Sequence, residues 1–167
     1  KGGSWQHIGL ADSHHIGKIE INPNDPNEVV VGVTGHLYSS DSSRGIYKTT
    51  DGGLSWTQTL SLENPVGIIE ISVAPENFAT QYAAAWEKDR KAWDFMGSGT
   101  GSGIYKSTDA GASWQRISTE NSGFPQGEGI GRIGLAAFDE KTIYAIVDNQ
   151  DRRPSERKAV SSLVKQD

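Results

Sequence analysis

Two long segments of this chain concentrate the side chains best suited to binding or catalysis. One segment, residues 34–44, contains His36, Tyr38 and Arg44, and the other, residues 86–102, mixes aromatic with charged residues. Aromatic rings beside carboxylates suit sugars, which offer apolar ring faces and hydroxyl groups. We therefore expect a ligand site drawn from seven residues in or near these segments: His15, His36, Trp86, Glu87, Arg90, Trp93 and Asp94.

These candidates also have structural interpretations. His14, His15 and His36 could hold a transition metal, but no metal-ligand spacing links them. A histidine bonded to a backbone carbonyl is favoured instead, and we expect neither a metal nor another cofactor. The charged run 87–94 could equally be a solvated loop. The glycine-rich run 97–103 lacks the lysine and the strand-to-helix setting of a phosphate-binding loop, so we expect a flexible connector there.

Glycoside hydrolysis needs two carboxylates, about 5–5.5 Å apart for retention or about 6.5–9.5 Å apart for inversion. A sialidase-like site needs an arginine cluster and a tyrosine nucleophile, and Arg44, Arg90 and Tyr38 are present without a matching motif. We assign no catalytic residue, and we favour a protein that is not an enzyme. The loop carboxylates have no spacing that forces a catalytic pair: Asp12, Asp41, Glu87, Asp89 and Asp94.

The composition excludes several classes of function. The 167 residues carry a net charge of −5 at pH 7, with 20 glycines and no cysteine. The acidic balance argues against a nucleic-acid partner, and the lack of cysteine excludes disulfides and thiol chemistry. No apolar run approaches the roughly 20 residues of a membrane-spanning helix. The start of the chain, Lys1 to Trp5, shows no apolar signal segment.

The elements that position the two loop segments can be inferred from a repeat. The stretch Gly45–Trp56 returns as Gly103–Trp114 with nine of twelve residues identical, at an offset of 58. Such a repeat indicates one supersecondary unit used more than once. Its Thr/Ser-x-Asp-x-Gly-x-Ser-Trp turn has an aspartate that can accept N–H bonds and a glycine that can take positive φ. We assign structural roles to six turn residues: Asp51, Gly53, Trp56, Asp109, Gly111 and Trp114.

Four strand types, A to D, recur in this order along the chain. The order predicts an all-β fold, a partial β-propeller of four-stranded antiparallel blades, with the aspartate turns between the third and fourth strands. In such blades the B–C and D–A loops, which carry the site candidates, share one end. Alternating residues predict A strands at 17–21, 67–71 and 131–135, B strands at 29–33, 81–86 and 142–147, C strands at 45–48 and 103–106, and D strands at 55–60 and 113–117.

The chain start fits the same register, since Ser4-Trp5 aligns with Ser55-Trp56 and Ser113-Trp114. This alignment predicts a further D strand there, with Trp5 in the core. We expect residues 1–149 to form about two and a half blades of a larger propeller, and residues 150–167 to be a polar tail or loop. Open strand edges then need cover from the remaining blades or from another chain.

The two turns resemble the Asp-box of BNR repeats, which occur in propellers of sialidases, other glycoside hydrolases and the sortilin (VPS10) family. The wider pattern resembles bacterial sortilin-like or glycosyl hydrolase-like BNR propellers. That resemblance implies a secreted, periplasmic or cell-surface protein. It is carried by four segments: residues 14–19, 34–38, 85–95 and 131–135.

Asp-boxes occur with unrelated activities, so they indicate fold more than function. We interpret the chain as a non-catalytic propeller fragment that binds protein or glycan, as the sortilin-like resemblance implies. One alternative is a BNR-type glycoside hydrolase that acts on extracellular polysaccharide. The other is a structural section of a larger assembly. The expected partners are thus a glycan or protein ligand and the remaining blades, without nucleic acid or a membrane span.

Overall fold

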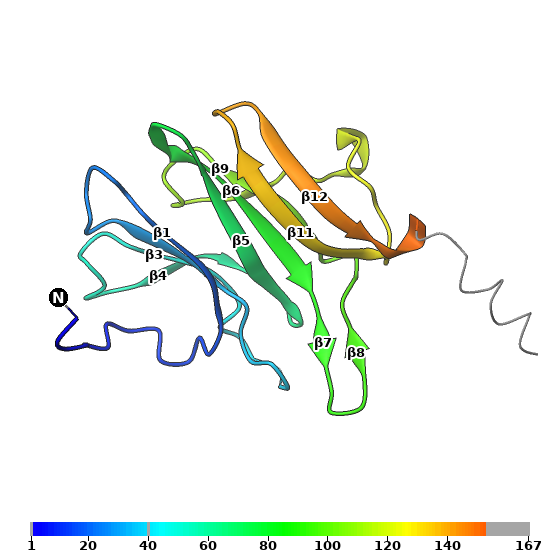
Figure 1. Ribbon diagram of the computed structural model, residues 1–167, viewed down its shortest axis with the longest axis horizontal. Helices are drawn as coiled ribbons and strands as arrows, with labels where there is room; N and C mark the ends of the chain where they lie inside the picture. Colours follow the sequence, from blue (N-terminus) through cyan, green and yellow to red (C-terminus); the bar gives the residue numbers. More distant parts are fainter. Residues whose placement is uncertain (1, 40, 153–167) are drawn as a thin grey trace, which may run out of the picture.

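The computed structural model describes residues 2–39 and 41–152 and consists of antiparallel sheets packed side by side (Figure 1). The first sheet, which we call the first blade, pairs its strands in chain order. It occupies the positions predicted for one A-to-D set. Its strands are β1 (Ile16–Ile21), β2 (Val29–Val33), β3 (Gly45–Thr49) and β4 (Thr57–Ser61).

The second blade repeats this arrangement, and Gly103 lies opposite Ala85 as Gly45 lies opposite Val33 in the first. A two-stranded third unit follows it, and a short hairpin interrupts the second blade between its second and third strands. The second blade consists of β5 (Val66–Ala74), β6 (Asn77–Glu87), β9 (Gly103–Ser107) and β10 (Gln115–Arg116), the hairpin of β7 (Asp89–Arg90) and β8 (Phe95–Met96), and the third unit of β11 (Ile130–Ala137) and β12 (Ile143–Asn149).

Two hydrophobic cores hold the three units together, and β6 contributes to both. Successive residues of a strand point to opposite faces of its sheet. Ala83 and Ala85 therefore belong to the core shared with the first blade, while Ala84 belongs to the core shared with the third unit. The first core also contains Val30, Ile46, Ile68, Ile71 and Phe78, and the second also contains Ile104, Ile130 and Ile133.

The aspartate turns between the third and fourth strands are closed by side-chain hydrogen bonds. The Thr49 hydroxyl donates to Asp51 Oδ1 at 2.7 Å, and the Ser55 N–H donates to the same oxygen at 2.9 Å. Gly53, with φ of 89°, donates its N–H to Thr49 Oγ1 at 3.0 Å. The second turn repeats these bonds around Asp109, at 2.7 and 2.9 Å.

The same bonds stabilise both turn carboxylates in their charged form. Hydrogen bonds from the Ser55 hydroxyl and N–H, followed by Thr49, lower the pKa of Asp51 to about 2. Slight burial opposes the ionisation of Asp109, but its bonds from Ser113 and Ser107 outweigh that cost and lower its pKa to about 2 as well. Both aspartates are therefore committed to bracing their turns.

The predicted strand at the chain start is wrong. No strand lies within residues 2–15, and Trp5 is 95% exposed instead of packing in a core. A strand is stable only when its N–H and C=O groups pair with a neighbour. In a complete blade the fourth strand pairs with the third. Within the described residues no such third strand lies beside Trp5 to supply that pairing.

The end of the described chain is a 3-10 helix, η2 (Gln150–Arg152), and another, η1 (Glu120–Ser122), lies in the loop before β11. The remainder of the predicted polar tail, residues 153–167, lies outside the described residues. Neither of these helices, in the part of the chain that the structure describes, is long and apolar enough to cross a membrane.

Candidate functional site

The hairpin β7–β8 extends the second blade at the end of the molecule where the B–C loops lie (Figure 1). Asp89 pairs with Met96 and Arg90 with Phe95, so the segment predicted as a long loop is partly a paired ribbon. The Lys91 N–H donates to Asp94 O at 2.8 Å and closes the tip. We therefore treat the hairpin as an ordered projection of the blade.

Aromatic side chains gather along this projection. Trp93, at the tip, is 86% exposed, and Phe95 is also exposed. At the base, Trp86 donates its indole N–H to Gly97 O at 2.8 Å, and its ring meets the Phe95 ring edge-on at a centroid distance of 6.2 Å. Trp86 is thus a fixed support, while Trp93 offers a free face to a ligand.

A polar cleft of about 480 Å³ opens beside the hairpin base, between the second blade and the third unit. The Gly101 N–H donates to Glu87 Oε2 at 2.7 Å, and the Gly129 N–H donates to Asp151 Oδ2 at 3.0 Å. Glu128 also lines the cleft and makes no hydrogen bond or ion pair with another described residue. The complete lining is Glu87, Met96, Ser98, Gly99, Thr100, Glu128, Gly129, Gln150 and Asp151.

The glycine-rich run beside this cleft is held in place, contrary to the flexible connector expected from the sequence. Gly99 is buried and donates its N–H to Ile130 O at 3.0 Å. A Cβ at Gly99 would lie 2.2 Å from the Glu87 carboxyl carbon. Glycine is therefore required at this position because the backbone passes directly against that carboxylate.

The first long loop is organised around a buried arginine. Arg44 is 2% exposed and donates to the carbonyls of Thr34 at 2.6 Å and His36 at 2.7 Å. Its Nε lies 3.2 Å from Asp41 Oδ2. Burial opposes ionisation of Asp41, but hydrogen bonds from Ser43 and the His36 N–H, with the Arg44 charge, keep the pKa of Asp41 below its usual value. Arg44 and Asp41 therefore serve the loop's structure.

The histidines lie at the same end of the first blade. His15 Nδ1 is 3.0 Å from Gly35 O, and the rings of His14 and His36 lie with centroids 3.4 Å apart at an interplanar angle of 38°. No cluster of potential metal ligands occurs among residues 2–39 and 41–152. His36 thus lies in the first long loop and His15 contacts that loop, so neither belongs to the hairpin site.

The structure brings five of the seven predicted residues together in or beside the hairpin: Trp86, Glu87, Arg90, Trp93 and Asp94. Asp94 serves the tip, where its Oδ1 accepts the Phe95 N–H at 2.9 Å. The prediction omitted Glu128 and Asp151. Glu128 could have been found because it lies in a D–A loop, which shares this end with the B–C loops, whereas Asp151 follows the last predicted strand.

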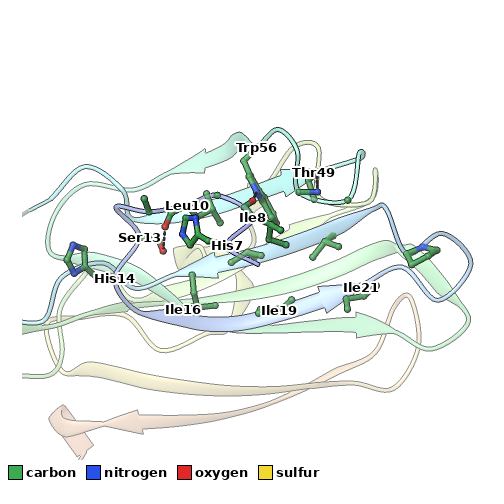
Figure 2. Close-up of a pocket in the computed structure, with 17 residues that line it drawn as sticks. His7, Ile8, Leu10, Ser13, His14, Ile16, Ile19, Ile21, Thr49 and Trp56 are labelled. Carbon is green, nitrogen blue, oxygen red and sulfur yellow. Dashed lines mark hydrogen bonds between the residues drawn. The ribbon is translucent and has the colours of Figure 1, made fainter. Parts of the chain in front are cut away.

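A second, apolar groove of about 570 Å³ lies on the outer face of the first blade, under residues 7–14 (Figure 2). Ile16, Ile19 and Ile21 of β1 line it, and Trp56 closes one side by donating its indole N–H to Ile8 O at 2.8 Å. The corresponding face of the second blade is covered by the first blade. We therefore interpret the groove as a packing face between blades.

Comparison with known proteins gives the fold its context. No protein-family model matches this chain, and no curated protein matches it. A solved ancestral GH74 enzyme is similar over 85% of this chain and 17% of its own length, with a TM-score of 0.55 and 20% identity. At that identity the likeness shows the fold alone. The predicted all-β partial propeller is confirmed.

Two further structures are similar. The GH74 xyloglucanase from Xanthomonas campestris matches over 80% of this chain and 20% of its own, with a TM-score of 0.48 and 19% identity. YCF48 from Cyanidioschyzon merolae matches over 89% of this chain and 41% of its own, with a TM-score of 0.46 and 18% identity. The chain spans a fifth or less of the length of these two GH74 enzymes.

Proposed function

We propose that this chain is part of a propeller that binds a glycan, without cleaving it, on the end that carries the β7–β8 hairpin. The supporting observation is the exposed Trp93 on an ordered hairpin beside a polar cleft of about 480 Å³. Sugar rings present apolar faces that pack on indole rings, and their hydroxyls can donate to carboxylates. The sortilin-like and BNR character of the repeat is part of the same proposal.

The position of the aromatic side chains supports binding by a surface of fixed shape. Trp86 and Phe95 brace each other at the base, and the Lys91 to Asp94 hydrogen bond closes the tip. The backbone that carries Trp93 is therefore already ordered before a ligand stacks on the ring. A preordered platform of this kind lowers the entropic cost of binding.

The test is a glycan screen followed by titration calorimetry with the best ligand. Trp93→Ala should weaken binding roughly tenfold, because one aromatic stacking contact is worth about 0.5–1.5 kcal/mol beyond its buried area. Trp5→Ala is the matched control, since Trp5 is equally exposed but lies at the chain start. Equal losses from both variants, or no bound sugar at all, would contradict the proposal.

A glycoside hydrolase is the second candidate, and the cleft favours it. Glu87, Glu128 and Asp151 all line one cavity, and cleavage of a glycosidic bond uses a pair of carboxylates. Two of these three bind backbone N–H groups, so Glu128 is the one of the three without a hydrogen bond or ion pair to a residue of 2–39 or 41–152. A hydrolase would release reducing ends from polysaccharides, and Glu128→Gln would abolish that release. Binding without turnover would reject this candidate and retain the first.

A further inference from the structure

Three cations near the hairpin base form no ion pair with another residue of 2–39 or 41–152. Lys88 follows β6, Arg90 lies in β7 and Arg132 lies in β11. The chain as a whole is acidic, with a net charge of −5, so a local cluster of cations outside the ion pairs stands out. The ion pairs found among the described residues involve other cations: Lys18, Arg44, Lys48 and Lys91.

Shared contacts place Lys88 next to the buried arginine of the first blade. The Lys88 N–H donates to Pro65 O at 3.4 Å, and Arg44 Nη1 donates to the same oxygen at 3.3 Å. Since Asp41 already pairs with Arg44, it does not neutralise Lys88. The backbone of Lys88 therefore lies beside the junction of the first and second blades.

A second set of contacts brings in Arg132. Lys88 Nζ lies 5.4 Å from the centroid of the Trp86 ring, and the Trp86 indole N–H donates to Gly97 O at 2.8 Å. A Cβ at Gly131 would lie 3.0 Å from that same oxygen and 2.8 Å from Asp148 Oδ2, so β11 runs directly past the oxygen. Arg132 is the next residue, is exposed, and lies in the bulge between Ile130 and Ile133, where the alternation of faces is interrupted.

Arg90 completes the cluster through the aromatic rings. Its guanidinium carbon lies 5.5 Å from the centroid of the Phe95 ring, which in turn contacts Trp86. The mutual effect of the cations is visible in one group: burial, and then the charges of Arg44, Arg132 and Arg90, lower the pKa of Lys88. A bound anion would relieve this repulsion.

We propose that Lys88, Arg90 and Arg132 bind the carboxylate or sulfate group of an acidic saccharide. This inference rests on the proposed function and names the ligand class for it. Arginine suits both anions because its guanidinium donates two parallel hydrogen bonds to their oxygens. Trp86 and Phe95 supply apolar surface between the cations, which a sugar ring can cover.

The neighbouring acidic cleft does not conflict with an anionic ligand. The Glu87 carboxylate accepts the Gly101 N–H, whereas Lys88 Nζ lies over the Trp86 ring. The charged groups of these two adjacent residues therefore lie in different places, one at the cleft and one at the aromatic rings. The acidic group of the ligand would meet the cations, and its hydroxyls would meet the cleft. The site thus selects sugars that carry charge on one part and hydroxyl groups on another.

The experiment is titration calorimetry of the full chain with three oligosaccharides of equal length: one with uronic acids, one sulfated and one neutral. The acidic ligands should bind at least about tenfold more tightly than the neutral one, and raising the salt should reduce that preference. Lys88→Gln and Arg132→Gln should each lose about tenfold, the size expected for one charge-assisted hydrogen bond. Lys141→Gln is the control, because it removes the same charge from the turn at the opposite end of β11 and β12.

The three oligosaccharides and the variants distinguish the possible outcomes. A preference for the uronic acid or for the sulfate identifies the anion, and either result supports the inference. Equal affinity for neutral and acidic ligands would overturn the inference and leave the proposed glycan binding intact. A loss in Lys141→Gln as large as in Lys88→Gln would also overturn it. If no saccharide binds, both proposals fail, and urea unfolding of each variant shows that the chain is folded.

Discussion

Two equivalent tryptophans show how a blade face is covered in this molecule. Trp114, in the second blade, donates its indole N–H to Thr59 Oγ1 of the first blade at 3.3 Å. Trp56, in the first blade, donates to Ile8 O at 2.8 Å. Thr59 is the third residue after Trp56, and Ile8 is the third residue after Trp5. The chain start therefore meets the first blade in the register in which the first blade meets the second.

The two interfaces differ in what provides the cover. A complete four-stranded sheet covers the second blade, whereas the segment 2–15, which contains no strand, covers the first and leaves a groove of about 570 Å³ (Figure 2). The tryptophan of a blade and a few apolar side chains can thus determine which residues of the neighbouring segment it contacts. Close packing needs the paired sheet as well, because only pairing fixes the backbone of the covering element.

The largest expected contrast is between Ile71 and Ile19. Ile71 pairs with Ala83 and Ile19 pairs with Val31, in each case in the second strand of the blade. Ile71 is fully buried, whereas Ile19 is 54% exposed. Ile71→Ala should lower the free energy of unfolding by about 3 kcal/mol, because it removes buried methyl groups and leaves a cavity. Ile19→Ala should cost less than about 1 kcal/mol. Urea denaturation measures both, and similar losses would show that the outer face is as well packed as the inner one.

The tryptophans themselves give the next contrast. Trp114 packs against the first core, so Trp114→Ala should cost about 2 kcal/mol, less than a fully buried tryptophan would. Trp56→Ala should cost about 1 kcal/mol, since it loses one hydrogen bond to a segment that no sheet holds. Urea midpoints test the order of the two variants. A larger loss at Trp56 would mean that residues 7–14 are held as firmly as a blade.

Substitutions at the turn glycines test the same comparison between the two interfaces. Gly111 and Gly53 both have positive φ, of 81° and 89°, so alanine is strained at either position. A Cβ at Gly111 would lie 2.9 Å from Val30 Cγ2 in the rigid first blade, and one at Gly53 would lie 2.9 Å from Ile8 Cδ1. Gly111→Ala should cost about 2 kcal/mol and Gly53→Ala about 1 kcal/mol, because Ile8 can move aside. Thermal unfolding reports the difference, and equal shifts would argue against it.

The smallest contrast is expected at the turn carboxylates, where the two blades are alike. Both Asp51 and Asp109 have a pKa of about 2, below the value of about 3.9 for an unfolded aspartate. Their stabilising effect is therefore complete above about pH 4 and is lost as the pH falls toward about 2. Asp51→Asn and Asp109→Asn should each flatten the acid limb of a plot of urea midpoint against pH, by similar amounts. A strong difference would show that the covering element influences the turn.

The strands were predictable because their signal is local. The period-2 alternation and the repeated turn locate β3 at Gly45–Thr49 and β9 at Gly103–Ser107 almost to the residue. The chain start was mispredicted by the same reasoning: Trp5 has the right neighbours in sequence, but a strand also needs a partner in space. Sequence similarity therefore predicted where residues 5–8 pack and failed to predict their backbone pairing.

The site was predictable only in part. Trp86, Trp93 and Arg90 lie in one unusual segment, so composition alone drew attention to them. Lys88 stood in the same segment, but its role depends on Arg132, 44 residues further along the chain. Arg132 occupies a strand position that reads as ordinary alternation, and β11 passes the hairpin base through the close approach of Gly131 to Gly97 O. Such a juxtaposition is a property of blade packing and has no signature in either segment.

Small residues in the second strands bear on how neighbouring units are oriented. Gly32 and Ala84 occupy the same position, opposite Ile46 and Ile104, and each faces the unit that follows. A Cβ at Gly32 would lie only 2.6 Å from Ile68 Cγ2. These small residues act as spacers, because their size limits how near the following sheet can approach. A small residue at this position in both four-stranded blades helps to set the angle between each blade and the unit that follows it.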